Sequence, residues 1–187
     1  MLINYETIRK AADRTVRKYK TDDVYRLCKA LDINIVYYPI GKHETAVKGF
    51  YTEISRIKMI TLNSDLPEEI QRVVIAHELG HSILKHRNEG ICRFHEYRLF
   101  DDTDRLEYEA NVFAAELMLS DEAVLEVLNA DTSFFTAASA LGVPPEILDF
   151  KFRMLKRKGY QFADPPIYSK SNFLKKTLNT GKPIIPK

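Results

Sequence analysis

The sequence has few of the features that mark membrane or exported proteins. No stretch approaches the ~20 consecutive apolar residues that a membrane-spanning helix requires. The first seven residues lack the basic segment and apolar core of a signal peptide. Cys28 and Cys92 are the only cysteines among 187 residues, and two cysteines make no disulfide framework. We therefore expect a cytoplasmic protein without a membrane segment, in which both cysteines are packing residues.

Acidic residues are scarce at the C-terminal end of the chain. Residues 151–187 contain ten Lys or Arg and one acidic residue, whereas the other 150 carry 18 basic and 25 acidic residues. A basic tail beside an acidic body is typical of contact with nucleic acid or with an acidic protein surface. A solvated tail that folds back on its own acidic body explains the pattern equally well. The charge pattern therefore does not decide between these two roles of the tail.

The most informative motif is His77-Glu78-Leu79-Gly80-His81, which matches the zinc-hydrolase pattern H-E-x-x-H. At about 100° per residue, His77 and His81 project from one face of a helix and can bind one metal ion. Glu78 points to the side of that pair, where a general base for proton transfer is needed. Two histidines and one glutamate at this spacing predict a zinc peptidase.

The same spacing can occur in a helix whose histidines are ordinary core residues. Ile70, Val74 and Leu84 share the stripe of the two histidines, so both imidazoles should face the interior. Burying unpaired polar groups is costly, and metal ligation supplies the partners. Gly80 lowers helix stability, which suggests that another segment approaches closely there. These features favour a metal site over a chance match.

A catalytic zinc needs a third protein ligand, and the sequence leaves more than one candidate. Arg87 stands where a third histidine of the metzincin type would be, and His86 should point away if the helix continues. Glu107 and Glu109 lie about 200° apart on a following helix, so only one can reach the metal. Spacing favours Glu109 weakly, because it borders the apolar stripe more closely. Glu116 is a candidate partner for Glu109.

The periodicity predicts an α+β fold in which a small three-stranded sheet packs on the motif helix. An edge strand of such a sheet can bind an extended peptide as an additional strand. The connection at 53–56 should be the turn of a hairpin. The expected helices are two within 4–31 and one each at about 67–87, 104–119, 121–129, 133–141 and 145–157, and the expected strands are 33–39, 47–52 and 57–62.

The motif and the segment Glu109-Ala110-Asn111-Val112-Phe113-Ala114-Ala115-Glu116-Leu117 together resemble the ImmA/IrrE family of metallo-endopeptidases. The resemblance spans roughly residues 5–158; a difference is Ser120, where the family often has proline. It implies a zincin-like core, with zinc held by His77, His81 and Glu109, because the family's third ligand directly precedes Ala-Asn. It also implies a protein substrate, typically a helix-turn-helix repressor of a phage or mobile element, whose cleavage relieves repression of transcription.

Hydrolysis by this site would use Glu78 as the catalytic base and a further donor to stabilise the oxyanion. His95, Tyr97 and Tyr108 are candidates for that donor, and none is assigned to the catalytic set.

A DNA-binding protein with a structural or inactive metal site is the alternative. Residues 136–148 resemble a helix-turn-helix, and the following helix is basic. Pro144-Pro145-Glu146 are poor base-reading residues, which favours a structural or docking role for this pair. We expect a peptidase domain over 1–120, a helical extension over 121–158 and a basic extended tail over 159–187.

Overall fold

The computed structural model describes residues 4–43, 46–86, 101–128, 132–161, 163 and 165–167, and of residues 101–104 only the backbone. These ranges form an α+β fold, as the sequence predicted. The elements in chain order are α1 (Tyr5–Tyr19), α2 (Val24–Ala30), β1 (Ile33–Tyr38), β2 (Gly49–Ile54), β3 (Ile57–Asn63), α3 (Glu68–Ile83), α4 (Asp101–Met118), α5 (Asp121–Leu128), α6 (Phe134–Ala140) and α7 (Pro145–Arg157).

The three strands form one mixed sheet in the order β1-β3-β2. Strand β1 runs parallel to β3, with Ile35 opposite Ile60, and β2 pairs antiparallel with β3. The predicted hairpin is present, but its turn is shorter than 53–56. Ser55 and Arg56 alone connect the strands, both at positive φ (51° and 69°), as a two-residue hairpin turn of type I′ requires.

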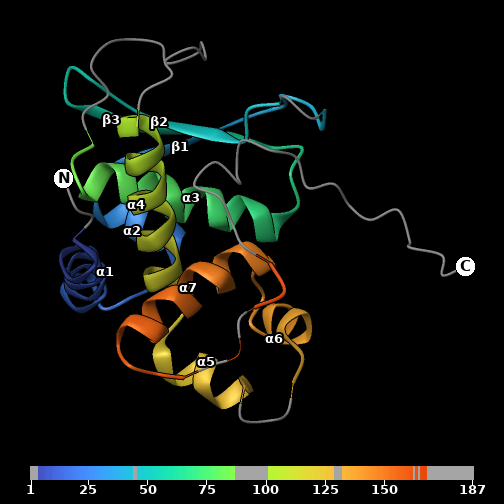
Figure 1. Ribbon diagram of the computed structural model, residues 1–187. Coiled ribbons are helices and arrows are strands. Elements are labelled where there is room, and N and C mark those ends of the chain that lie inside the picture. Colours follow the sequence, from blue (N-terminus) through green and yellow to red (C-terminus); the bar gives the residue numbers. More distant parts are fainter. Residues whose placement is uncertain are drawn as a thin grey trace, which may run out of the picture.

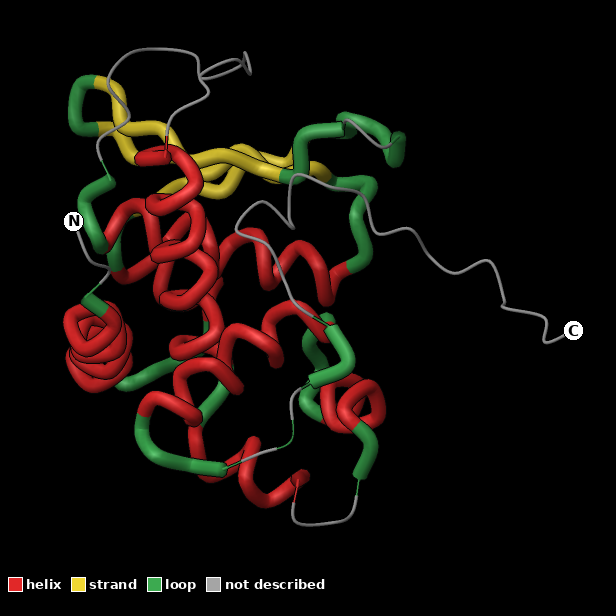
Figure 2. Tube along the Cα trace, viewed as in Figure 1, coloured by secondary structure: helices red, strands yellow, loops and turns green. Residues whose placement is uncertain are grey.

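The sheet forms one layer, and the helices lie on one side of it (Figure 2). Helix α3 lies beneath the sheet and contacts β2, β3, α2 and α4 (Figure 1). Every residue from Val73 to His81 is buried, whereas the sequence had predicted burial of one stripe. The motif helix is therefore the centre of the core, which explains why its polar side chains must find partners within the protein.

The helix-turn-helix-like pair exists as α6 and α7, but most of α7 is buried. Its residues 147–152 are all buried, and it packs against α4 and α6. Lys151, one of its basic residues, is 1% exposed, and its Nζ lies 3.0 Å from Glu116 Oε1 and 2.7 Å from Asp121 Oδ1. A recognition helix must present one face to the major groove. The burial of residues 147–152 is unfavourable for such a contact and agrees with the predicted structural or docking role.

Replacing Lys151 by Ala should lower the free energy of unfolding by up to about 3–5 kcal/mol, because the buried Glu116 carboxylate (3% exposed) then keeps only the more distant Lys158, whose Nζ lies 3.8 Å from its Oε2. Chemical denaturation of this variant and of Lys156→Ala, a more exposed lysine of the same helix, measures the difference. Equal losses in the two variants would show that the buried ion pair does not stabilise the contact between α4 and α7.

The sequence predicted an irregular segment over 91–104, but α4 already begins at Asp101. Residues 91–100, with Cys92, and most of the basic tail lie outside the described residues. The boundary at residue 120 stays a prediction; α7 packs against α4 across it. No helix in the described part of the chain is both long and apolar enough to span a bilayer.

Candidate metal centre

The two motif histidines meet on one face of α3, as their spacing predicted. His77 is 3% exposed and His81 9%, and their Nε2 atoms lie 3.0 Å apart. Two neutral imidazoles can share at most one proton between such nitrogens. The pair therefore presents lone-pair density to a common point, as a metal site requires.

Glu107 completes this cluster from α4. Its Oε2 lies 3.3 Å from His77 Nε2, and its Oε1 lies 3.8 Å from His81 Nε2. Zinc with N and O ligands at about 2.1 Å in a tetrahedron places its ligand atoms about 3.4 Å apart. The two imidazole nitrogens lie 3.0 Å apart, and one oxygen of Glu107 is 3.3 Å from His77 while its other oxygen is 3.8 Å from His81, all close to that value. The donor atoms thus fit a divalent cation with two imidazoles and one carboxylate.

Gly80 lets α4 approach close enough to deliver Glu107. A Cβ atom at Gly80 would lie 3.1 Å from the Cα of Ala110, 3.2 Å from its carbonyl oxygen and 3.3 Å from the Cβ of Phe113. The close approach predicted from this glycine is therefore present, and the approaching segment is the backbone of α4. A larger residue at position 80 would push apart the two helices that carry the candidate ligands.

Gly80→Ala should separate α3 and α4 by a few tenths of an ångström, weaken metal binding and reduce stability by about 1–3 kcal/mol through overpacking. Alanine's better helix propensity, about 1 kcal/mol, offsets only part of this cost. Zinc affinity by chelator competition and denaturant unfolding of the metal-free protein report the two effects separately. An unchanged zinc affinity would contradict the role of this contact in placing Glu107.

Asn111 orients the first histidine. Its side-chain oxygen lies 2.8 Å from His77 Nδ1, and both side chains are buried. An amide oxygen only accepts hydrogen bonds, so Nδ1 carries the proton and Nε2 keeps its lone pair toward the cluster. Metal-binding histidines usually donate their other ring nitrogen to such an acceptor. The tautomer of His77 therefore suits a metal ligand.

Glu109, the third ligand expected from the sequence, makes other contacts. Its Oε1 accepts a hydrogen bond from Arg105 Nε at 2.8 Å, and its Oε2 lies 3.2 Å from His86 Nε2. The structure thus brings Glu107 to the facing Nε2 atoms of the histidine pair in place of Glu109. The reason is the crossing point of α4 on α3, which turns the side of Glu107 and Asn111 toward the motif helix. Glu107 and Asn111 are four residues apart and therefore share one face of α4. This polar pair was the feature of the sequence that could have indicated Glu107 as a ligand.

His86 also departs from expectation, because α3 ends at Ile83 and not near residue 87. Lys85 adopts φ 57°, which reverses the chain and lets His86 N donate to the carbonyl oxygen of His81 at 3.0 Å. The His86 ring consequently lies beside the cluster, with its Nδ1 3.1 Å from His81 Nδ1. If α3 continued through residue 86, the His86 side chain would point away from the two motif histidines.

The proposed base, Glu78, is 8% exposed and lies against the sheet. Its Oε2 accepts a hydrogen bond from the backbone N–H of Tyr51, on strand β2, at 2.9 Å. Hydrogen bonds from backbone N–H groups stabilise the ionised form of a carboxylate. The contact therefore fixes one oxygen of Glu78 next to the sheet edge.

The pKa of His77 reflects its acidic surroundings. Burial lowers it, but the hydrogen bond to Glu107 and the charges of Glu78 and Glu107 outweigh this effect, so that the pKa is raised. A proton held more tightly at His77 competes with a cation for the same cluster. Metal binding at this site should accordingly weaken as the pH falls.

The other residues considered for the site lie elsewhere. The ring of Tyr108 packs edge-on against Tyr5 and Phe150, with centroids 6.1 and 5.3 Å away, between α1 and α7. Glu116 pairs with Lys151 and is not a partner of Glu109. His95 and Tyr97 lie outside the described residues.

Comparison with known proteins agrees with this geometry. The peptidase M78 family model, described as the IrrE N-terminal-like domain, matches residues 28–153, more than half of the chain. The chain belongs to the ImmA/IrrE family of metallopeptidases. It is 35% identical over 147 residues to "Uncharacterized immunity region protein 2" of Bacillus phage phi105, covering 79% of this chain and 90% of the phage protein. It is 27% identical over 150 residues to "Metallopeptidase ImmA" of Bacillus subtilis strain 168, covering 79% and 85% of the two chains.

The match to the ImmA/IrrE family begins in α2 and ends in α7. It therefore includes the whole sheet, both helices of the candidate metal centre and the helix-turn-helix-like pair. The α6–α7 pair is thus part of the region shared with this family, which agrees with the packing of α7 against α4.

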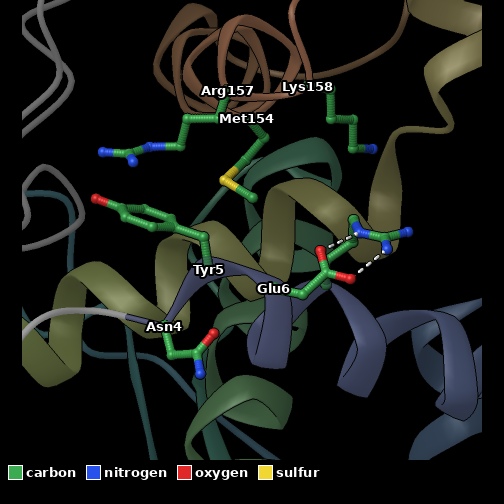
Figure 3. A pocket seen from close by; sticks show the side chains of 7 residues that line it. Asn4, Tyr5, Glu6, Met154, Arg157 and Lys158 are labelled. Carbon is green, nitrogen blue, oxygen red and sulfur yellow. Dashed lines mark hydrogen bonds and ion pairs between the residues drawn. The ribbon is translucent and has the colours of Figure 1, made fainter.

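A cavity of about 460 Å³ lies at a different place, between α1 and α7 (Figure 3). Its cations are already engaged: Arg9 pairs with Glu6 at 2.8 Å, and the guanidinium of Arg157 lies 3.7 Å from the ring centroid of Tyr5. None of the candidate metal ligands lines this cavity. The candidate metal chemistry is therefore located at the α3–α4 cluster and not in this cavity.

Proposed function

We propose that this protein is a zinc-dependent endopeptidase in which His77, His81 and Glu107 hold the metal and Glu78 is the catalytic base. The observation that carries the proposal is the convergence of the three donor side chains beside the buried carboxylate of Glu78. Glu109, the ligand that the family resemblance implied, remains the alternative to Glu107 and is tested against it below.

The donor set favours zinc over other divalent cations. Magnesium and calcium prefer sites built from oxygen atoms, whereas two imidazoles and one carboxylate are the catalytic ligands of several zinc peptidases. Three protein ligands leave one coordination position for a reactant. A bound zinc ion would polarise the scissile carbonyl and lower the pKa of water.

Glu78 would supply the proton transfers of peptide hydrolysis. Its carboxylate would accept the proton of the attacking water and later donate it to the nitrogen of the leaving amine. The N–H of Tyr51 holds Oε2 in place, so the carboxylate enters the reaction already oriented.

Strand β2 is the element best placed to bind the substrate backbone. It is an edge strand of the sheet, and its Tyr51 N–H contacts the proposed base. An extended peptide can join such an edge through main-chain hydrogen bonds, which orient it independently of sequence. A peptide bound along β2 would run next to Glu78.

We propose a helix-turn-helix transcriptional repressor as the substrate, cut so that repression is relieved. The resemblance to the ImmA/IrrE family supports this choice, as does the similarity to a phage protein named for an immunity region. Such a substrate would place the enzyme in the cytoplasm.

The test is to incubate the zinc-loaded protein with a candidate helix-turn-helix repressor and to map the products by mass spectrometry. We expect cleavage at one or a few bonds, loss of cleavage with a chelator and recovery with zinc. Cleavage of unrelated unfolded proteins but not of the repressor would contradict the proposed substrate while keeping the peptidase. No cleavage of any protein by the metal-loaded chain would contradict the enzyme.

A further inference from the structure

We infer that Glu109 and His86 form a hydrogen-bond relay that fixes the ring of His81 for metal binding. This inference rests on the proposed function, because it names positioning residues of that same site. Neither residue would touch the metal or the substrate; both act through His81.

The relay consists of three consecutive contacts. His81 Nδ1 lies 3.1 Å from His86 Nδ1, His86 Nε2 lies 3.2 Å from Glu109 Oε2, and Arg105 Nε donates to Glu109 Oε1 at 2.8 Å. His86 is 8% exposed and Glu109 9%, so water is largely excluded from the chain of contacts. The partly exposed Arg105 closes it at the outer end.

The donors and acceptors along the relay select one arrangement of protons. The carboxylate of Glu109 only accepts, so Nε2 of a neutral His86 carries the proton and its Nδ1 is an acceptor. His81 Nδ1–H then donates to that acceptor, and His81 Nε2 keeps a lone pair toward His77 and Glu107. A ligand through Nε2 requires this tautomer.

The two ligating histidines would thus be oriented by different means. Asn111 on α4 accepts directly from His77 Nδ1, whereas the ring of His86 lies between His81 Nδ1 and Glu109 of α4. That ring is in place because the chain reverses at Lys85. Glu107 and Glu109 therefore have separate duties: one carboxylate would bind the metal, and the other would orient a ligand.

Removing a partner that orients a ligand typically weakens metal binding about 10–100-fold, while the ligand set itself is unchanged. We therefore expect Glu109→Leu and His86→Phe each to weaken zinc binding by that factor. Glu109→Gln should lose less, because its amide oxygen can still accept from His86 Nε2. Partial rescue by glutamine separates hydrogen bonding from simple packing.

The experiment measures zinc affinity by chelator competition, and the visible absorption of the cobalt(II)-substituted protein, for wild type and these variants. Glu122→Gln, an exposed glutamate on α5, is the control for charge. In the relay variants, the cobalt bands should keep the intensity of the wild-type site. In Glu107→Leu, they should shift or disappear.

Three results would overturn the relay, and they are distinguishable. Unchanged zinc affinity in both Glu109→Leu and His86→Phe would remove the relay and leave the zinc peptidase standing. Loss of the cobalt bands in Glu109→Leu but not in Glu107→Leu would make Glu109 the ligand. No metal binding by the wild-type chain would overturn the relay and the proposed function together. Should Glu109→Leu fail to fold, Arg105→Gln loosens the same carboxylate from its solvent side and should weaken zinc binding in the same direction.

Discussion

Replacing Glu78 by Gln should reduce peptide hydrolysis about 10²–10⁴-fold or more, because a carboxamide cannot accept the proton of the attacking water. The change preserves the size of the side chain, and the amide oxygen can still accept from the N–H of Tyr51. Metal affinity and thermal stability should therefore stay close to wild type. Steady-state cleavage rates with metal content measured on the same sample check both halves of this expectation.

Glu69→Gln is the matched control, since Glu69 is an exposed glutamate in the first turn of the same helix. It should leave hydrolysis unchanged. A Glu78→Gln variant that retains full activity with bound metal would show that another group moves the proton. Loss of metal in that variant would instead assign Glu78 a role in coordination.

Replacing Glu107 by Ala should have the second-largest effect, a weakening of zinc binding by more than about 100-fold, which exceeds the usual cost of losing an outer partner. Two imidazoles alone would remain, and a catalytic zinc needs three protein ligands. Activity at limiting zinc should fall in parallel. Calorimetric titration with zinc, beginning from metal-free protein, measures the affinity.

The comparison that gives this result meaning is Glu109→Ala, two residues away on the same helix. We expect its loss to be smaller, on the order of 10–100-fold, because only the orientation of His81 suffers. The reverse order, with Glu109→Ala losing the metal and Glu107→Ala retaining it, would restore the ligand assignment implied by the family resemblance.

Much of the fold followed from local patterns in the sequence. Short segments rich in β-branched and aromatic residues indicated all three strands, and Asp23, directly before α2, caps that helix. The two histidines at helical spacing meet on one face, and Gly80 marks the point where α4 touches α3. These features depend on near neighbours in the chain or on a single tight contact, so they can be predicted from the local sequence.

The remaining features depend on how helices cross, which spacing alone does not determine. Glu107 and Glu109 lie on opposite sides of α4, and the contact at Ala110 decides which of them faces the histidines. His86 joins the cluster only because Lys85 adopts a left-handed conformation. Glycine is the usual sequence signal for that conformation at the end of a helix, and lysine is not. The burial of α7 likewise follows from its packing on α4, whereas its basic composition had suggested an exposed helix.

The most direct test of the metal centre is a crystal structure of the zinc-loaded protein with anomalous data collected at the zinc edge. We expect one strong peak about 2.0–2.2 Å from His77 Nε2, His81 Nε2 and a carboxylate oxygen of Glu107. Glu109 should remain with His86 and Arg105. A peak bound to Glu109 or His86, or a zinc-soaked crystal with no peak between α3 and α4, would contradict it.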